Sequence, residues 1–177
     1  MTHEAYKDED LASLLSSVRT IAVVGASPNP VRASFIVIKY LIGKGYDVHP
    51  VNPGIAGGEI LGRKVYASLA ELPANVDMLD IFRNADAAMG IVQDAVAEKE
   101  RLGLKVVWMQ LGVRNDMAAE LAEAAGLSVV MNRCPKLEYG RLSGEIGWLG
   151  INSGRLTSKR PLLSPAGVQS LKIKAGS

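Results

Sequence analysis

Short apolar, β-branched runs recur along the chain and alternate with segments that have a helical period. The runs occupy residues 21–24, 46–51, 78–82, 106–111 and 127–131. Each has the length of a strand, and its apolar composition is typical of strands buried on both faces of a parallel sheet. The pattern therefore predicts five parallel strands.

The segments between the strands carry apolar residues three and four positions apart, as amphipathic helices do. They predict helices over residues 8–18, 31–43, 85–102 and 116–125, and glycines follow or end three of these segments. Strand and helix alternate with a period of roughly thirty residues, which indicates right-handed βαβ units. We expect an α/β, Rossmann-like three-layer sandwich with a five-stranded parallel sheet in the order 3-2-1-4-5.

The character of the chain changes after about residue 150. Residues 151–177 are rich in Ser, Gly, Pro and basic side chains and have no strong period. We interpret residues 1–150 as one domain and residues 151–177 as a flexible or loosely docked basic tail. An alternative is that this tail clasps a partner subunit.

Composition excludes several classes of function. Lys and Arg outnumber Asp and Glu by 20 to 18, and aromatic residues make up 5%, so neither a basic face nor stacking platforms for nucleic acid are expected. The single cysteine allows no intrachain disulfide. The first ten residues, MTHEAYKDED, do not resemble a secretion signal, and no apolar run approaches the ~20 residues of a membrane span. We expect a cytoplasmic protein.

The turn after the first strand is the best candidate for binding phosphate, because ligands of open α/β sheets lie beyond the carboxyl ends of the strands. We place the switch point of the sheet between strands one and four. Gly25 allows a sharp turn, Ser27 offers a hydroxyl, and the next helix begins near Arg32 and Ser34. The alternative is structural: Gly25 makes a tight connection, and Ser27 or Asn29 caps the helix.

The dinucleotide fingerprint is incomplete in this turn. Ser27 and Pro30 stand where its second and third glycines would fall, and Asn52 replaces the acid that binds a ribose diol. These departures argue against NAD but not against another phosphate ligand. Arg83, which follows the third strand, and Phe82 are further candidates for contacting a phosphate or a base.

Four segments together resemble a known family: IAVVGASPNPVRASFIVIKYLIGKGYDVHPVNP, VDMLDIFRN, VVWMQLGV and VVMNRCPKLEYGRL. Across residues 8–142 the chain is similar to the small stand-alone CoA-binding domain proteins, which are related to the CoA-binding domain of the succinyl-CoA synthetase α subunit. The resemblance implies a Rossmann-type fold with coenzyme A or an acyl-CoA along the carboxyl edge of the sheet. The residues that it implies for the cofactor are Gly25, Ala26, Ser27, Arg32, Ser34, Val51, Asn52, Pro53, Phe82, Arg83, Gln110, Asn132 and Cys134.

The second loop departs from the family pattern. Relatives usually carry a lysine close after its Asn-Pro, where it meets the CoA 3′-phosphate, whereas this chain has Gly54 and Ile55. A cationic contact to that phosphate would then have to come from Arg63, Lys64 or an arginine elsewhere in the chain.

The sequence leaves open whether the protein is an enzyme, but it favours binding without turnover. The ligase relatives use a phosphorylated histidine on a second domain, and this chain has two histidines, His3 and His49, of which we expect His49 to pack in a strand. Cys134 precedes a proline without a histidine base, so a structural role is expected, and we expect no metal site. A sensing, carrier or regulatory role follows.

Two alternatives remain: an NAD(P)-binding, oxidoreductase-like enzyme, or a protein-interaction module with a vestigial nucleotide site. Assembly as a homo-oligomer or with another protein is also left open.

Overall fold

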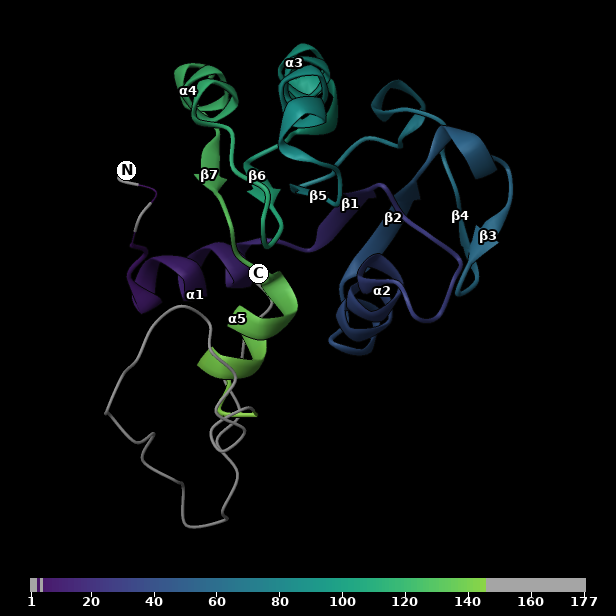
Figure 1. The fold of residues 1–177 in the computed structure, drawn as a ribbon, viewed down its shortest axis with the longest axis horizontal. Coiled ribbons are helices and arrows are strands. Elements are labelled where there is room, and N and C mark those ends of the chain that lie inside the picture. Colours follow the sequence, from purple (N-terminus) through teal and green to yellow (C-terminus); the bar gives the residue numbers. More distant parts are fainter. Residues whose placement is uncertain (1–2, 4, 146–177) are drawn as a thin grey trace.

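A five-stranded parallel sheet forms the centre of the computed structural model, which describes residues 3 and 5–145 (Figure 1). Its order is β2-β1-β5-β6-β7. The strands are β1 (Thr20–Val24), β2 (Asp47–Val51), β5 (Met78–Ile81), β6 (Val106–Met109) and β7 (Ser128–Val130). The predicted α/β sandwich with five parallel strands is confirmed.

Helices cover both faces of this sheet (Figure 1). One layer holds α1 (Asp8–Ser17), α2 (Ala33–Gly43) and α5 (Pro135–Leu142), and the other holds α3 (Ala85–Leu102) and α4 (Asp116–Ala124). The four predicted helices are present with bounds that differ by two residues at most. Helix α5 was not predicted, because it has eight residues and follows its strand almost directly.

The predicted strand order, 3-2-1-4-5, is wrong: in the same numbering the sheet runs 2-1-3-4-5. The third strand, β5, pairs with β1 instead of β2. Pro50 lies inside β2 and has no N–H to donate to a ladder, which suits β2 to the edge of the sheet. The switch point therefore lies between β1 and β5, not between strands one and four.

The connection from β2 to β5 contains no α-helix. It holds two short 3₁₀ helices, η1 (Pro53–Ile55) and η2 (Leu69–Glu71), and between them the hairpin of β3 (Glu59–Ile60) and β4 (Arg63–Lys64). Neither the hairpin nor the 3₁₀ helices were predicted. The connection runs beyond the edge of the sheet and returns on the side of α3 (Figure 1).

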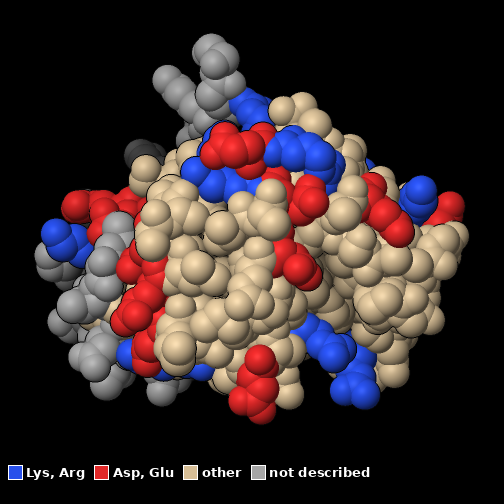
Figure 2. All heavy atoms as spheres, turned by 90° about the horizontal axis from the view of Figure 1, so that it is seen from above, with Lys and Arg blue, Asp and Glu red and all other residues tan. Residues whose placement is uncertain are grey.

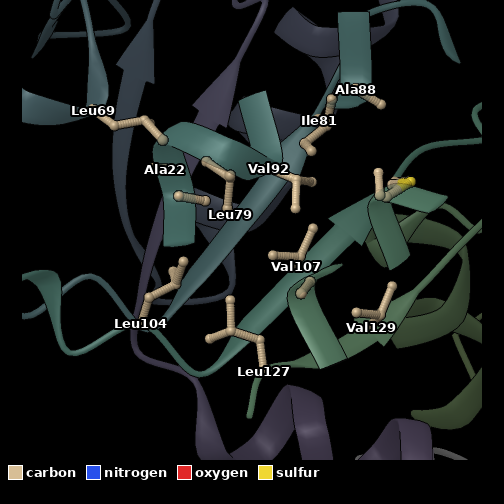
Figure 3. Close-up of a cluster of buried hydrophobic side chains, with 14 of the residues drawn as sticks. Ala22, Leu69, Leu79, Ile81, Ala88, Val92, Leu104, Val107, Leu127 and Val129 are labelled. Carbon is tan, nitrogen blue, oxygen red and sulfur yellow. The ribbon is translucent and has the colours of Figure 1, made fainter. Parts of the chain in front are cut away.

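The core consists of two apolar clusters, one on each face, because successive strand residues point to opposite sides. On β1, for example, Ala22 packs toward α3 while Ile21 and Val23 pack toward α2. Figure 3 shows the cluster under α3 and α4, which includes Leu79, Val107 and other buried residues. This burial fixes the strands, and with them the loops at their carboxyl ends.

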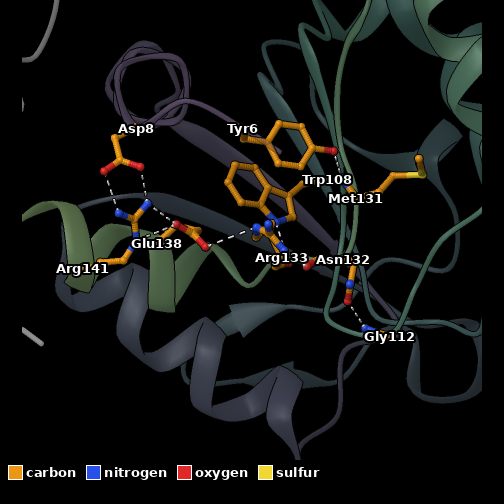
Figure 4. A network of polar contacts seen from close by, with 9 residues as sticks. All are labelled: Tyr6, Asp8, Trp108, Gly112, Met131, Asn132, Arg133, Glu138 and Arg141. Atoms are coloured by element: carbon orange, nitrogen blue, oxygen red, sulfur yellow. Dashed lines mark hydrogen bonds and ion pairs between the residues drawn. The ribbon is translucent and has the colours of Figure 1, made fainter. Parts of the chain in front are cut away.

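A polar network fastens α1 and α5 to the sheet (Figure 4). Arg141 donates to both carboxylate oxygens of Asp8, at 2.9 and 3.0 Å, and to Glu138 at 2.7 Å. The backbone N–H of Met131 donates to the Tyr6 hydroxyl at 2.7 Å. These contacts join residues before the first strand to residues after the last one.

Among the described residues, no helix combines the length and the apolar character that crossing a membrane requires. The predicted tail, residues 151–177, lies outside the described part of the chain.

Candidate functional site

The turn after β1 packs directly against the loop after β5. Gly25 has a φ of +85°, and a Cβ atom placed on it would lie 2.5 Å from the carbonyl oxygen of Phe82. A side chain cannot be accommodated there without a shift of backbone, so glycine is required both for the turn and for the close approach. This contact marks the switch point of the sheet.

The loop after β2 is tied to the same turn. The backbone N–H of Gly25 donates to the carbonyl of Val51 at 3.0 Å, and the Asn52 side-chain amide donates to the carbonyl of Ala26 at 2.8 Å. The Asn52 side-chain oxygen accepts from the N–H of Gly54 at 2.9 Å. Three strand ends thus converge, and the Asn52 amide is used to hold them together.

A pocket with a volume of about 290 Å³ opens at this point. Its walls come from the ends of β1, β2 and β5, from the connection before η2, and from one face of α3. The lining residues are Val24, Gly25, Val51, Asn52, Pro53, Ala67, Ser68, Leu69, Arg83, Ala87, Ile91 and Asp94.

The charges around the pocket suit an anionic ligand at its strand-end side. Arg83 is exposed and lines the pocket, and no ion pair or hydrogen bond of its side chain is present within the described residues. Helix α3 begins two residues later, where the Asn84 side chain accepts from the N–H of Ala87 at 3.1 Å. A helix N-terminus and a free guanidinium both favour phosphate. On the face shown in Figure 2, acidic and basic side chains are interspersed among uncharged ones.

The structure brings several of the predicted residues together. Gly25, Val51, Asn52, Pro53 and Arg83 line the pocket, and Ala26 is buried directly beside it through its hydrogen bond to Asn52.

Four other predicted residues surround the first turn without lining the pocket. The Ser27 hydroxyl accepts from the N–H of Asn29 at 3.2 Å, a contact within the turn; Ser27 does not cap α2, whose N-cap is Arg32. Ser34 is buried in the first turn of α2, and Phe82 is partly buried against the core on the α2 side. Arg32 is exposed at the N-cap of α2, and its side chain contacts no charged or polar partner among the described residues.

Gln110 lies on the other side of the sheet from the pocket. Its Nε2 donates to both carboxylate oxygens of Asp80, at 2.9 and 3.0 Å. Burial raises the pKa of Asp80 to about 8, and the hydrogen bond from Gln110 opposes this shift. The amide nitrogen of Gln110 is therefore engaged with a buried carboxyl group.

Asn132 and Cys134 belong to the loop between β7 and α5. Asn132 has a φ of +53°, and its side-chain oxygen accepts from the N–H of Gly112 at 2.8 Å (Figure 4). Cys134 is 7% exposed, and burial raises the pKa of its thiol, which disfavours the reactive thiolate. Neither residue lines the pocket.

The two basic residues considered for the CoA 3′-phosphate are placed on the outer hairpin. Arg63 forms an ion pair with Asp47, and the ammonium of Lys64 lies 5.1 Å from the centre of the Tyr66 ring. Neither lines the pocket.

Sequence reasoning missed the far wall of the pocket. Ala87, Ile91 and Asp94 lie at positions i, i+4 and i+7 of α3 and so share one face, a spacing that the sequence already contains. Residues 67–69 had no comparable signal, because their position depends on the path of the connection from β2 to β5.

Apart from Asp94, the groups that could perform acid-base or metal chemistry, namely His49, Asp80 and Cys134, lie outside the pocket. His49 packs against Tyr66 with ring centres 5.8 Å apart, and burial lowers its pKa. No three His, Cys, Asp or Glu side chains within residues 3 and 5–145 are grouped so that they could hold a metal ion.

Comparison with known proteins agrees with this fold. The sequence model of the CoA binding domain matches residues 19–140. Uncharacterized protein YneT of Bacillus subtilis is 32% identical over 130 residues, which are 73% of this chain and 92% of YneT. A hypothetical protein from Pyrococcus horikoshii has a solved structure that is 42% identical, with a TM-score of 0.72 over 78% of this chain and 93% of that one.

A larger relative is the α subunit of acetate–CoA ligase (ADP-forming) I from Pyrococcus furiosus. It is 39% identical over 99 residues, which are 52% of this chain and 20% of the subunit. The resemblance drawn from the sequence motifs is thereby confirmed: the chain belongs to the CoA-binding domain family.

Proposed function

We propose that this protein binds coenzyme A or an acyl-CoA along the carboxyl edge of its sheet. The observation that carries the proposal is the pocket at the switch point, lined by Gly25, Asn52 and Arg83, in a chain of the CoA-binding domain family. In doubly wound sheets, ligands bind at this place.

The chemistry of the pocket matches the nucleotide end of the ligand. The phosphates are assigned to the strand-end side, where Arg83 supplies a positive charge and Gly25 lets the backbone come close. The apolar part of the pocket, built from side chains such as Val51, Leu69 and Ile91, takes the base. The pantetheine arm then extends along the sheet edge toward Gln110 and Asn132.

We further propose that binding occurs without turnover, in a sensing, carrier or regulatory role in the cytoplasm. The support is chemical. The Cys134 thiol is buried with a raised pKa, and the Asp80 carboxyl is fully buried. Neither group lines the pocket, so neither can reach a ligand there as a nucleophile or base without rearrangement.

NAD is a poorer fit to the same pocket. An NAD site places an acidic side chain at the end of the second strand to accept from the ribose hydroxyls. Here that position is Asn52, whose amide is already bound to Ala26 and Gly54.

Calorimetric titration with CoA, acetyl-CoA, NAD and NADP tests the proposal. We expect CoA and acetyl-CoA to bind and Arg83→Ala to weaken both roughly ten- to hundredfold, the range for a charge-assisted hydrogen bond. Arg63→Ala is the matched control, since it removes the same charge outside the pocket. Binding of NAD without CoA, or equal effects of the two substitutions, would overturn the proposal.

A further inference from the structure

The pocket continues from the strand ends along α3. Ala87, Ile91 and Asp94 lie on one face of this helix and span ~10 Å of its axis. The strands end beside the start of α3, so Asp94, in its third turn, is the lining residue farthest along the helix from the strand ends.

The wall opposite α3 is held in place at this far end. Arg101 of α3 donates to the backbone carbonyls of Leu69 and Leu72, at 2.8 Å each. Leu69 belongs to both the pocket lining and the buried core (Figure 3). The two walls of the pocket are thus joined to each other by hydrogen bonds within the protein.

The two charged residues of the lining are Arg83 and Asp94, and aliphatic side chains line the pocket beside them. Val24 lies at the strand ends, Ile91 about one turn before Asp94 on α3, and Leu69 on the wall opposite α3. A flat heteroaromatic ring fits such a slot, with its faces against aliphatic groups and its polar edge toward the far end. With phosphates at Arg83, the base edge of a nucleotide points to Asp94.

The Asp94 carboxylate is available for a ligand. It is exposed, and no hydrogen bond or ion pair of Asp94 is found in the described part of the chain. Arg101, seven residues further along the helix, contacts Glu98 and the carbonyls of the opposite wall instead. An ionised carboxylate only accepts hydrogen bonds, so it pairs with an N–H donor on the base.

We propose that Asp94 determines base specificity by accepting a hydrogen bond from the exocyclic 6-amino group of adenine. This inference rests on the proposed function, because it assumes that the nucleotide end of CoA occupies the pocket. A 6-oxo purine such as hypoxanthine presents a carbonyl oxygen in place of the 6-amino group, and its nearest donor, N1–H, lies one ring position further along the edge. A carboxylate placed to accept from the 6-amino group therefore faces the carbonyl oxygen unless the base shifts. Sites built to pair a substrate N–H reject the analogue that lacks it.

Displacement of bound CoA by ADP and by IDP tests this role in the full-length protein. The wild type is expected to prefer ADP at least about tenfold, as expected for one charge-assisted hydrogen bond. In Asp94→Asn the amide can donate to the 6-oxo group, so the preference falls to about twofold or reverses. Asp86→Asn, an exposed first-turn aspartate of α3 outside the pocket lining, keeps the wild-type preference.

The outcomes separate the two proposals. If CoA itself does not bind, the proposed function fails. If CoA binds but ADP and IDP displace it equally, or if Asp94→Asn keeps the wild-type preference, the role of Asp94 is refuted alone. Stronger displacement by GDP, whose N1–H and 2-amino group also suit a carboxylate, would likewise refute the assignment to adenine.

Discussion

The buried carboxyl group of Asp80 makes the protein less stable at neutral pH than an amide in its place would. Asp80 is fully buried in a central strand, and its pKa is raised from 3.8 to about 8 because burial disfavours the charged form. Between these two pH values the folded state keeps a proton that the unfolded chain releases. The free energy of unfolding therefore falls as the pH rises through this window.

The size of the effect follows from the width of the window. Each pH unit above 3.8 lowers the free energy of unfolding by about 1.4 kcal/mol, so the loss reaches about 4 kcal/mol at pH 7. Asp80→Asn keeps the acceptor for Gln110 and cannot ionise. We expect the variant to gain about 2–4 kcal/mol at pH 7, allowing for the new amide donors, and almost nothing near pH 4.

Urea unfolding of both proteins between about pH 4 and about pH 8 measures this difference. The quantity to compare is the difference in free energy of unfolding between the variant and the wild type. The lowered pKa of His49 makes stability rise with pH in both proteins, so its contribution cancels in this difference. Asp10→Asn, at an exposed position in the first turn of α1, should change stability by less than about 0.5 kcal/mol. A gain from Asp80→Asn that does not vary with pH, or a loss at neutral pH, would refute the reasoning.

Two further predictions concern the loops around the pocket. Gly25→Ala should lower the free energy of unfolding by about 1–3 kcal/mol and abolish CoA binding, because its Cβ would meet the Phe82 carbonyl at a positive φ. The control is Gly43→Ala, which has open space around it and should change neither thermal unfolding nor CoA titration. Gly54→Lys should strengthen CoA binding about three- to tenfold, because it places a cation in the second loop, and should leave the affinity for dephospho-CoA unchanged in the same titration. The site has room for the side chain, since a Cβ on residue 54 would lie 3.4 Å from the Asn52 side chain, an ordinary contact. Equal changes for CoA and dephospho-CoA would show that the introduced lysine does not meet the 3′-phosphate, and an unaltered Gly25→Ala protein would show that the turn tolerates a side chain.

The strands and long helices were predictable because each carries its own signal. An apolar run such as Val106–Met109 favours burial on both faces of the sheet, and the period of Ala85–Leu102 favours a helix with one buried side. The order of the strands is a property of the connections, which periodicity does not report. Pro50 is the one local sign in the sequence that β2 is an edge strand.

The candidate site was predictable at positions where the residue type is needed to form a turn of the backbone. Gly25 and Asn52 shape turns at strand ends, and their types reveal this in the sequence. Asp94 was not predicted, because an exposed aspartate on a helix carries no signal of a binding site in the sequence. Its place in the pocket depends on the path of the connection from β2 to β5, which forms the opposite wall. Gln110 was predicted to contact a ligand because it follows a strand, but its amide nitrogen donates a hydrogen bond to Asp80 instead.

The contact between Asp8 and Arg141 has a consequence for how the domain can be divided. The family match covers residues 19–140, so both partners of this ion pair lie just outside it, one on each side. Tyr6, which receives the N–H of Met131, also precedes the match. A fragment cut at the family borders would keep every strand but lose α1, and with it part of the cover over one face of the sheet. The borders of the family match therefore differ from those of the packed structure, which extends beyond them on both sides.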